Sequence, residues 1–441
     1  MKPINTFLSV LVLGMLCACI GTTINQAPAT IDENHLKHHV TVLAHDSLEG
    51  RGAGYRGDLR AAKYLAQNFK DIGLESLKAK ENNLDDYLQS FNFYTLGDLK
   101  PWQKMSSQNV VAILKGSELP DEYIVIGGHL DGQGLKTQAD LGKSIPEGII
   151  TDKEAAKKDT IWNSAVDNAV SIASIIEITR VLKNNKVRLK RSIIFVGFNA
   201  EENSLDGSIY FVNNPIVPLH QMKAMINLEK IVGDPEALFA YCTNGEKTPV
   251  FEKIAVKTDN LGGIKAPNFP LPILANTDHY AFIMNKIPAI TMGTGSQINI
   301  HTSLDHADRL DYKLLEQRTE YILNYLVNLT NSEADEFMFT DDLSEVTGVT
   351  GGPATEEEMF SQGFKGERAF KVANIVKNTV GEKAGIQPED LIISVNGKMV
   401  KKKPFYQGLE DALGDEYDPK ESKVLLEVIR GGGIMEIELE Y

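Results

Sequence analysis

Acidic and imidazole side chains stand directly after several short apolar segments of this chain. One β-rich apolar run leads into two adjacent acids, Glu201 and Glu202, and another leads into His129 and Asp131. Imidazole nitrogens and carboxylate oxygens bind zinc, and a carboxylate beside the metal can accept a proton from metal-bound water. Open α/β sheets keep their ligands just beyond the carboxyl ends of the strands. The pattern therefore predicts one shared metal site at one sheet edge.

Three further residues fit the same site. Glu229 ends a third apolar run, and His301 follows a fourth run through a glycine-rich loop. Asp167 precedes an apolar helical segment, where it could cap the helix or bridge two cations. Each residue also has an ordinary interpretation, since the Glu201-Glu202 pair could be solvated and His301 could be a capped surface histidine. Their coincidence at one sheet edge favours the metal site.

The elements that must position these residues alternate between strand-like and helix-like patterns. The segment 169–182 is apolar nearly all round, which indicates a buried helix, and 312–329 has the pattern of a closing amphipathic helix. The segment 132–160 is polar and mixed in charge, which indicates a surface insertion. The alternation predicts an α/β fold, a three-layer α/β/α sandwich with a mostly parallel central sheet.

The composition is that of an ordinary globular protein. The chain has 441 residues, and 45 basic against 60 acidic residues give a formal charge of −15. This charge argues against a nucleic-acid partner and against broad binding to anionic membranes. The acidic stretch 331–342 lacks apolar periodicity and predicts a linker between a first domain at 33–330 and a second at 343–441.

The start of the chain has the pattern of an export signal. A positive charge precedes the apolar run 7–16, which is too short for an ordinary transmembrane helix. The residues around Cys19 resemble a bacterial lipobox, which implies a signal peptide at 1–18, a lipid anchor on Cys19 and a tether at 19–32. Cys17 is unusual in a lipobox, so ordinary cleavage and secretion stay open. We expect an exported protein in the periplasm or outer membrane that contacts the membrane only through this anchor.

The second domain has short strand-like runs. They occupy 370–376, 391–395, 424–429 and 434–439. The sequences 384–390 and 392–397 resemble a PDZ domain, with Glu389 where that family usually has glycine. The resemblance implies a small β-rich domain whose groove accepts an extended peptide or a protein C-terminus as an added strand, with 348–352 near the carboxylate-binding loop. A rigid spacer without a ligand is the alternative.

The site residues of the first domain form an ordered series of motifs. They are His129-x-Asp131, Asp167-Asn168, Glu201-Glu202, Asn227-Leu228-Glu229, Thr277-Asp278-His279 and His301. The series resembles that of the co-catalytic zinc peptidases of metallopeptidase family twenty-eight. This family includes bacterial leucyl aminopeptidases, glutamate carboxypeptidases and glutaminyl cyclases. The resemblance covers roughly 35–329, and Leu48-Glu49-Gly50-Arg51 near its start belongs to it.

The resemblance implies two zinc ions per chain. One ion would be bound by His129, Asp167 and Glu229. The other would be bound by Asp167, Glu202 and His301, so that Asp167 bridges the two ions. The aminopeptidases more often have aspartate at the position of Glu229, and the longer side chain here could shift one metal or alter specificity.

The resemblance also implies the catalytic roles. Glu201 would be the general base, Asp131 would orient His129, and the Asp167–Asn168 peptide would be cis. We expect a zinc-dependent exopeptidase, an aminopeptidase acting on peptides, because one ion can also receive a free α-amine. A carboxypeptidase, another amidohydrolase or a glutaminyl cyclase on the same scaffold is an alternative. A further alternative is a non-catalytic scaffold that binds peptides through the PDZ domain. The intact set of metal ligands argues against this alternative.

Overall fold

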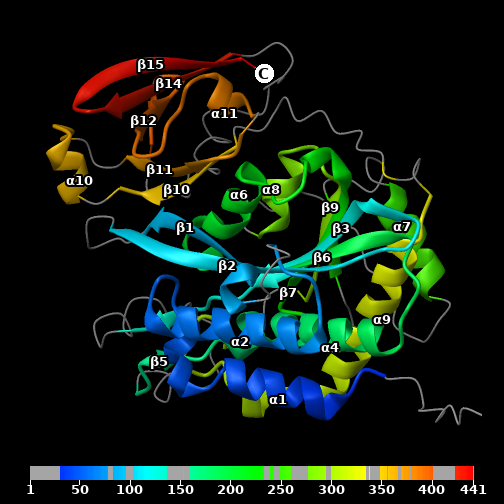
Figure 1. The fold of residues 1–441 in the computed structure, drawn as a ribbon. Coiled ribbons are helices and arrows are strands. Elements are labelled where there is room, and N and C mark those ends of the chain that lie inside the picture. Colours follow the sequence, from blue (N-terminus) through cyan, green and yellow to red (C-terminus); the bar gives the residue numbers. More distant parts are fainter. Residues whose placement is uncertain are drawn as a thin grey trace, which may run out of the picture.

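The fold is taken from a computed structural model of the chain (Figure 1). The residues that it describes are 30–77, 83–95, 103–136, 152, 158–232, 239–242, 249–259, 277–294, 299–333, 337, 348–354, 356–365, 369–377, 379–400 and 423–440. The predicted signal peptide and most of the predicted tether lie outside these ranges. Within them, no helix is long and apolar enough to cross a membrane.

A seven-stranded sheet forms the centre of the first domain, in the order β1-β2-β6-β3-β7-β9-β8. Its strands are β1 (Leu88–Tyr94), β2 (Lys104–Leu114), β3 (Leu119–His129), β6 (Arg191–Phe198), β7 (Met222–Glu229), β8 (Phe239–Cys242) and β9 (Ala289–Gly293). The inner strands β6, β3, β7 and β9 run parallel, and the outer strands pair antiparallel with their neighbours. The predicted mostly parallel sheet is therefore confirmed.

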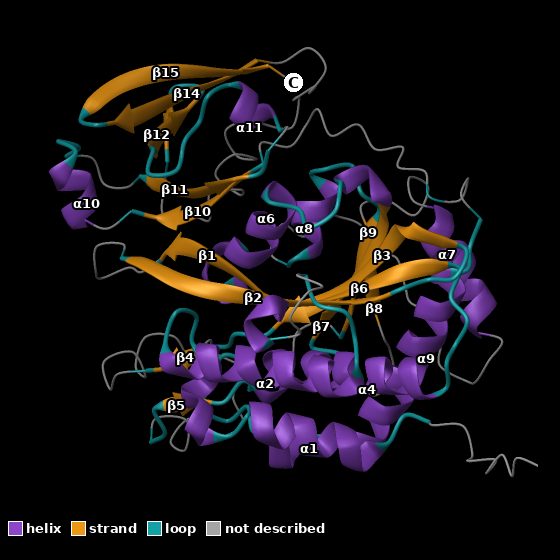
Figure 2. Cartoon of the chain, viewed as in Figure 1, coloured by secondary structure: helices purple, strands orange, loops and turns teal. Residues whose placement is uncertain are grey.

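Helices cover both faces of this sheet (Figure 2). The larger hydrophobic cluster lies under α1 (Glu33–Leu43), α2 (Arg56–Ile72), α4 (Val170–Asn184), α7 (Pro249–Asp259) and α9 (Tyr312–Thr330). A second cluster on the other face lies under α6 (Asp206–Asn213) and α8 (His279–Ile283). Helices α4 and α9 coincide with the helices that the sequence predicts over 169–182 and 312–329. The three-layer sandwich is confirmed.

The parallel strands end level with one another. His129, the last residue of β3, pairs with Phe198 at the end of β6. Glu229, the last residue of β7, pairs with Gly293 at the end of β9. Since parallel strands present their carboxyl ends at the same edge, the polar residues at or after these ends gather in one place.

The ends of the predicted surface insertion are tied together. The short strands β4 (Gly134–Leu135) and β5 (Ile161–Trp162) pair antiparallel, while 137–151 and 153–157 lie outside the described residues. Gly50 packs against this pair with a φ of 64°, and a Cβ there would stand 2.4 Å from the carbonyl oxygen of Trp162. Only glycine fits that close approach.

Among the residues that the structure describes, the second domain is an antiparallel sheet with two short helices. Its elements are β10 (Val349–Pro353), α10 (Glu356–Ser361), β11 (Phe370–Ile375), α11 (Val380–Lys383), β12 (Leu391–Val395), β13 (Lys398–Met399), β14 (Lys423–Arg430) and β15 (Gly433–Glu440). The sheet order is β10-β11-β12-β14-β15, with β13 beside β12. Strands β11, β12, β14 and β15 match the four predicted runs. The stretch 348–352 largely forms the edge strand β10.

A buried carboxylate ties the loop before α2 to the sheet. Asp58 Oδ2 accepts hydrogen bonds from the main-chain N–H of Gly54 at 2.7 Å and from Ser107 Oγ in β2 at 2.6 Å. The other oxygen, Oδ1, has no hydrogen-bond partner among the residues that the structure describes. Burial raises the pKa of Asp58 to about 7 in spite of these bonds. Folding therefore favours the protonated form.

Replacing Asp58 by asparagine should remove a pH dependence of stability. The pKa of Asp58 is raised in the folded state. The wild type therefore loses stability as the pH rises from 3.8, the ordinary pKa of the carboxyl group, through about 7. The amide oxygen can accept both bonds and carries no charge. Between pH of about 4.5 and 7.5, we expect the unfolding free energy of Asp58→Asn to rise relative to the wild type by on the order of 1–4 kcal/mol. Urea unfolding of the metal-free proteins measures this difference, and a constant difference would contradict the burial argument.

Candidate metal centre

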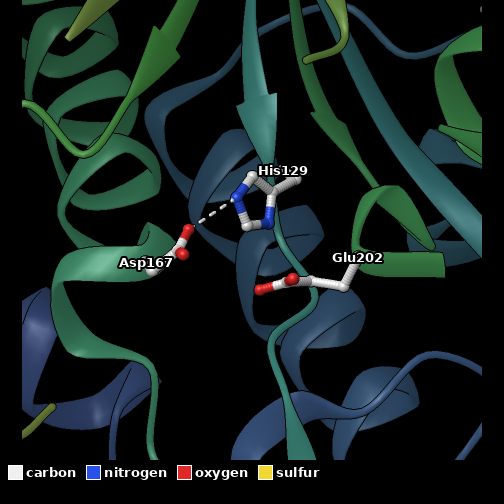
Figure 3. Close-up of side chains that lie close together, drawn as sticks. All are labelled: His129, Asp167 and Glu202. Atoms are coloured by element: carbon white, nitrogen blue, oxygen red, sulfur yellow. Dashed lines mark hydrogen bonds and ion pairs between the residues drawn. The ribbon is translucent and has the colours of Figure 1, made fainter. Parts of the chain in front are cut away.

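His129 lies at the centre of the residues that gather at the sheet edge (Figure 3). Its side chain is fully buried. Nε2 lies 3.1 Å from Asp167 Oδ1, 3.4 Å from Glu229 Oε1 and 3.9 Å from Glu201 Oε2. Nδ1 lies 3.2 Å from the main-chain carbonyl oxygen of Asp131. A hydrogen bond from Nδ1 to that oxygen fixes the tautomer in which Nε2 can act as a metal ligand.

Asp167 lies between two imidazoles. One carboxylate oxygen faces His129, and the other, Oδ2, lies 2.9 Å from His301 Nε2. Its peptide bond to Asn168 is cis, as the family resemblance implies. A carboxylate that offers one oxygen to each of two neighbouring ligand groups has the placement that a bridging ligand needs.

Glu202 and His301 form the outer part of the cluster. His301 Nε2 lies 3.5 Å from Glu202 Oε2, which also accepts a hydrogen bond from Gln133 Nε2 at 2.5 Å. The other oxygen, Glu202 Oε1, is buried and has no hydrogen-bond partner among the described residues. A buried carboxylate oxygen without a partner destabilises the fold, and a bound cation would satisfy it. The residues present therefore fit a divalent metal ion.

The candidate ligand atoms fall into two overlapping groups. Atoms of His129, Asp167 and Glu202 lie within 4.8 Å of one another, and so do atoms of His129, Glu201 and Glu229. The structure thus brings the predicted ligands together, with His301 joined through Asp167. Glu201 lies beside the residues expected to hold the first ion. Imidazole and carboxylate donors are those that zinc binds in catalytic sites.

Burial and mutual repulsion set the charges of these acids. Burial raises the pKa of Glu201 well above its ordinary value, and it raises that of Glu202 to about 7 with a contribution from the charge of Asp167. Burial alone would also raise the pKa of Asp167, but Lys230 and the imidazole of His129 hold it well below its ordinary value. A divalent cation would relieve the same repulsion more completely.

Lys230 belongs to this cluster although the sequence does not predict it. Its Nζ pairs with Glu229 and lies 3.7 Å from Asp167 Oδ1. The ammonium group therefore offsets part of the negative charge of two candidate ligands. A lysine directly after a strand-ending acid is the signal in the sequence, but a solvated lysine would give the same signal.

Arg51 ties together the segments around the site. Its guanidinium is buried and donates hydrogen bonds to the main-chain carbonyl oxygens of Leu43, Leu130, Asn163 and Ser164, at 2.6–2.8 Å. These carbonyls belong to the end of α1, to the loop after β3 and to the loop before the bridging acid. The Leu48-Glu49-Gly50-Arg51 motif, which the resemblance includes without a role, thus positions the loops that carry the ligands.

Asp305 holds the loop of the bridging acid from the other side. Its carboxylate accepts hydrogen bonds from the main-chain N–H groups of Val166 at 2.7 Å and Asp167 at 3.2 Å. Burial raises the pKa of Asp305 to about 6. Nothing in the sequence marks this residue, because an acid four residues after His301 carries no pattern of its own.

Asp131 makes a contact beyond the one that the resemblance implies. Its carboxylate lies 3.7 Å from His129 Nδ1, farther than its own main-chain carbonyl. The carboxylate accepts hydrogen bonds from the main-chain N–H groups of Glu201 at 3.2 Å and Glu202 at 3.3 Å. Asp131 therefore positions the two adjacent acids, while its main chain positions the imidazole.

The chain is similar to several known proteins. Residues 109–326 match the peptidase family M28, and residues 371–413 match the PDZ domain. A probable zinc metalloprotease of Phaeosphaeria nodorum is 27% identical over 218 residues, which cover 47% of this chain and 40% of that protein. The probable leucine aminopeptidase 2 of Aspergillus oryzae is 25% identical over 207 residues, which cover 44% of this chain and 35% of that protein. The chain thus spans less than half the length of these curated relatives.

Solved structures share the fold. BSAP, a zinc aminopeptidase from Bacillus subtilis, has a TM-score of 0.52 and 14% identity, and the match covers 71% of this chain and 98% of that one. A glutaminyl cyclase from Bacteroides thetaiotaomicron has a TM-score of 0.51 and 18% identity, over 69% of this chain and 99% of that one. Because both chemistries occur on this fold, the likeness shows the architecture alone.

Replacing Arg51 by lysine should destabilise the fold around the site. A single ammonium group cannot reach all the carbonyl oxygens that the guanidinium joins, so some of these buried oxygens lose this partner. We expect Arg51→Lys to lose roughly 2–5 kcal/mol of unfolding free energy, measured by urea unfolding. Arg60, half-exposed and bonded to the carbonyl oxygen of Ser47, is the matched control. Arg60→Lys should change stability by less than about 0.5 kcal/mol, and similar losses in both variants would refute the role of Arg51.

Proposed function

We propose that this protein, which carries a domain of peptidase family M28 followed by a PDZ domain, is a zinc-dependent aminopeptidase that removes N-terminal residues from peptides. The observation that carries the proposal is the placement of Asp167, with one carboxylate oxygen toward His129 and the other toward His301. The names of the curated relatives, a zinc metalloprotease and a leucine aminopeptidase, support the same class.

Two zinc ions per chain are assigned to the site. His129, Asp167 and Glu229 would hold one ion, and Asp167, Glu202 and His301 would hold the other. The contacts of His129 and His301 with Asp167 support a bridging role for that carboxylate. When bound, the ions lower the pKa of a water molecule and stabilise the charge that develops on the scissile carbonyl oxygen.

Glu201 is the proposed general base. Its side chain is nearly buried and lies beside His129, and its main-chain N–H is held by Asp131. Burial raises the pKa of Glu201 well above its ordinary value. Glu201 would take the proton of the attacking water and return it to the leaving amine.

The proposal extends to the substrates of the protein, the ligand of its PDZ domain and its cellular location. Peptides are the proposed substrates, and the PDZ groove would bind a peptide or a protein C-terminus. We also propose export and a lipid anchor on Cys19 in the cell envelope. These proposals are supported by the sequence resemblances. Residues 1–29 and 401–422 lie outside the described part of the chain.

Glu201→Gln should abolish turnover and leave metal binding intact. The amide keeps the size of the side chain but cannot accept the water proton, so we expect kcat to fall by about 10²–10⁴-fold. The assay is hydrolysis of a panel of aminoacyl-p-nitroanilides by zinc-loaded protein lacking residues 1–19, with zinc content measured alongside. Glu118→Gln, at a half-exposed acid away from the site, should behave as the wild type.

Each result of that assay separates the candidate functions. Wild-type turnover that Glu201→Gln loses supports the aminopeptidase and ranks its side-chain preference. Full activity of Glu201→Gln would remove Glu201 as the base. Failure of the wild type on every member, with zinc bound, would overturn the aminopeptidase and direct the test to blocked peptides with free carboxyl ends. Protein without stoichiometric zinc would favour the non-catalytic scaffold.

His301→Ala should lower the zinc content from two ions to one. His301 is assigned to the second ion alone, so its loss leaves the set of His129, Asp167 and Glu229 in place. Zinc content after dialysis against a mild chelator measures the change. His306→Ala removes a nearby, partly exposed histidine and should keep both ions. Retention of two ions by His301→Ala would show that the second ion is held elsewhere.

A further inference from the structure

We propose that the PDZ domain is a structural part of the active site, and that Asn374 in its strand β11 is a positioning residue. Through the buried carboxylate of Asp206, Asn374 would hold the turn α5 (Glu201–Ser204), which carries the proposed base and one proposed zinc ligand. The inference rests on the proposed function for the roles of Glu201 and Glu202.

The turn α5 is not fixed by apolar packing of its own. None of its four residues is buried. Ala200 before it and Leu205 after it have left-handed backbone, with φ of 58° and 59°. Residues other than glycine seldom adopt this conformation, and they do so where the surrounding structure holds them in it. Ala200 and Leu205 are buried among apolar side chains, and polar contacts at both ends hold the turn between them.

One carboxylate holds each end of the turn. At the start, Asp131 accepts hydrogen bonds from the main-chain N–H groups of Glu201 and Glu202. At the end, Asn203 Nδ2 donates to Asp206 Oδ2 at 2.7 Å, and the main-chain N–H of Asp206 donates to the carbonyl oxygen of Ala200 at 3.1 Å. The first carboxylate belongs to the loop after β3, and the second begins α6.

Asp206 depends on the PDZ domain for half of its partners. Its side chain is buried, and its Oδ1 accepts a hydrogen bond from Asn374 Nδ2 at 2.5 Å. The two carboxylate oxygens thus each receive one amide, from Asn203 in the turn and from Asn374 in β11. Loss of Asn374 leaves one buried oxygen without this donor. A shift of Asp206 toward another donor would weaken its bond with Asn203, and the bond from Asn203 Nδ2 to the carbonyl oxygen of Tyr94 would then hold the end of the turn alone.

The rest of the interface keeps β11 against α6. Asn213, the last residue of α6, donates from Nδ2 to the carbonyl oxygen of Ile375 at 3.0 Å and accepts from the main-chain N–H of Lys377 at 3.1 Å. Val376 is fully buried and belongs to the hydrophobic cluster on that face of the peptidase sheet. Figure 1 shows β10 and β11 beside α6, and β10 also contacts α5. The PDZ domain therefore presents Asn374 to Asp206 from a fixed position.

The test compares two substitutions at the same interface in the full-length, zinc-loaded protein. Asn374→Ala removes the donor to Asp206, whereas Lys377→Ala removes only the contact of Lys377 Nζ with the carbonyl oxygen of Asn213. We expect Asn374→Ala to lower kcat about 10- to 100-fold with little change in KM, and Lys377→Ala to change neither. The first readout is steady-state hydrolysis of the best aminoacyl-p-nitroanilide.

A second readout does not depend on activity. Hydrogen exchange of peptides that cover 199–207, measured by mass spectrometry on the metal-free protein, reports how firmly the turn is held. We expect exchange of these amides to become about tenfold faster in Asn374→Ala and to stay unchanged in Lys377→Ala.

An exchange of the two side chains tests the contact itself. Asn374→Asp places a second carboxylate against Asp206 and should be at least as harmful as Asn374→Ala. In the double variant Asp206→Asn/Asn374→Asp, the amide at 206 can still accept from Asn203 and can donate to the new carboxylate, so kcat and exchange should recover toward the wild type. Such recovery would show that the contact between residues 206 and 374 itself, rather than the size or polarity of either residue alone, holds the turn.

The outcomes separate this inference from the proposed function. Unchanged kcat and unchanged exchange at 199–207 in both Asn374 variants would overturn the positioning role and leave the PDZ domain as an attached module. If the wild type hydrolyses no substrate, the proposed function fails, but the exchange experiment still decides whether Asn374 holds the turn.

Discussion

Repulsion among carboxylates that are buried or nearly buried is the constraint on which the rest of this structure depends. Asp167, Glu201 and Glu229 all lie within 4 Å of the single imidazole nitrogen His129 Nε2. At such distances like charges raise one another's pKa and destabilise the folded state unless cations compensate. Lys230 and the imidazoles offset part of this charge. Divalent metal ions would complete the compensation, so the proposed metal site needs strong support from the residues around it.

The part of this arrangement that the sequence predicts is the part encoded locally. A buried strand is an unbroken apolar run, and the acid or histidine that ends it is adjacent in sequence, as at His129 and Glu229. Parallel pairing turns these separate local signals into one spatial cluster, because the strand ends meet at the same edge. The family resemblance adds the order of the motifs and the cis peptide at Asp167–Asn168. The fold class, both predicted helices over 169–182 and 312–329 and the clustering of ligands follow from these signals.

The supports of the cluster could not be predicted, because their partners are distant and mostly main-chain groups. Arg51 binds carbonyl oxygens up to 113 residues away, and Asp305 binds N–H groups 138 and 139 residues away. Every residue has a carbonyl oxygen, so nothing in the sequence marks which ones a guanidinium will meet. Asp131 shows the same limit within a recognised motif. Its family role concerns His129, whereas its carboxylate accepts bonds from the turn that carries Glu201.

The contact between the two domains also joins residues that are distant in the sequence, so the sequence does not predict it. The sequence predicts a linker at 331–342 and therefore two units, and a small interface between such units would ordinarily permit relative motion. Here the second unit inserts a fully buried valine, Val376, into the core of the first and supplies a donor to the buried Asp206. Separating the domains would expose Val376 and leave Asp206 without that donor. None of the four residues of the turn with the adjacent acids is buried, and polar contacts hold both of its ends. Residues on both sides of the predicted domain boundary therefore stabilise the site.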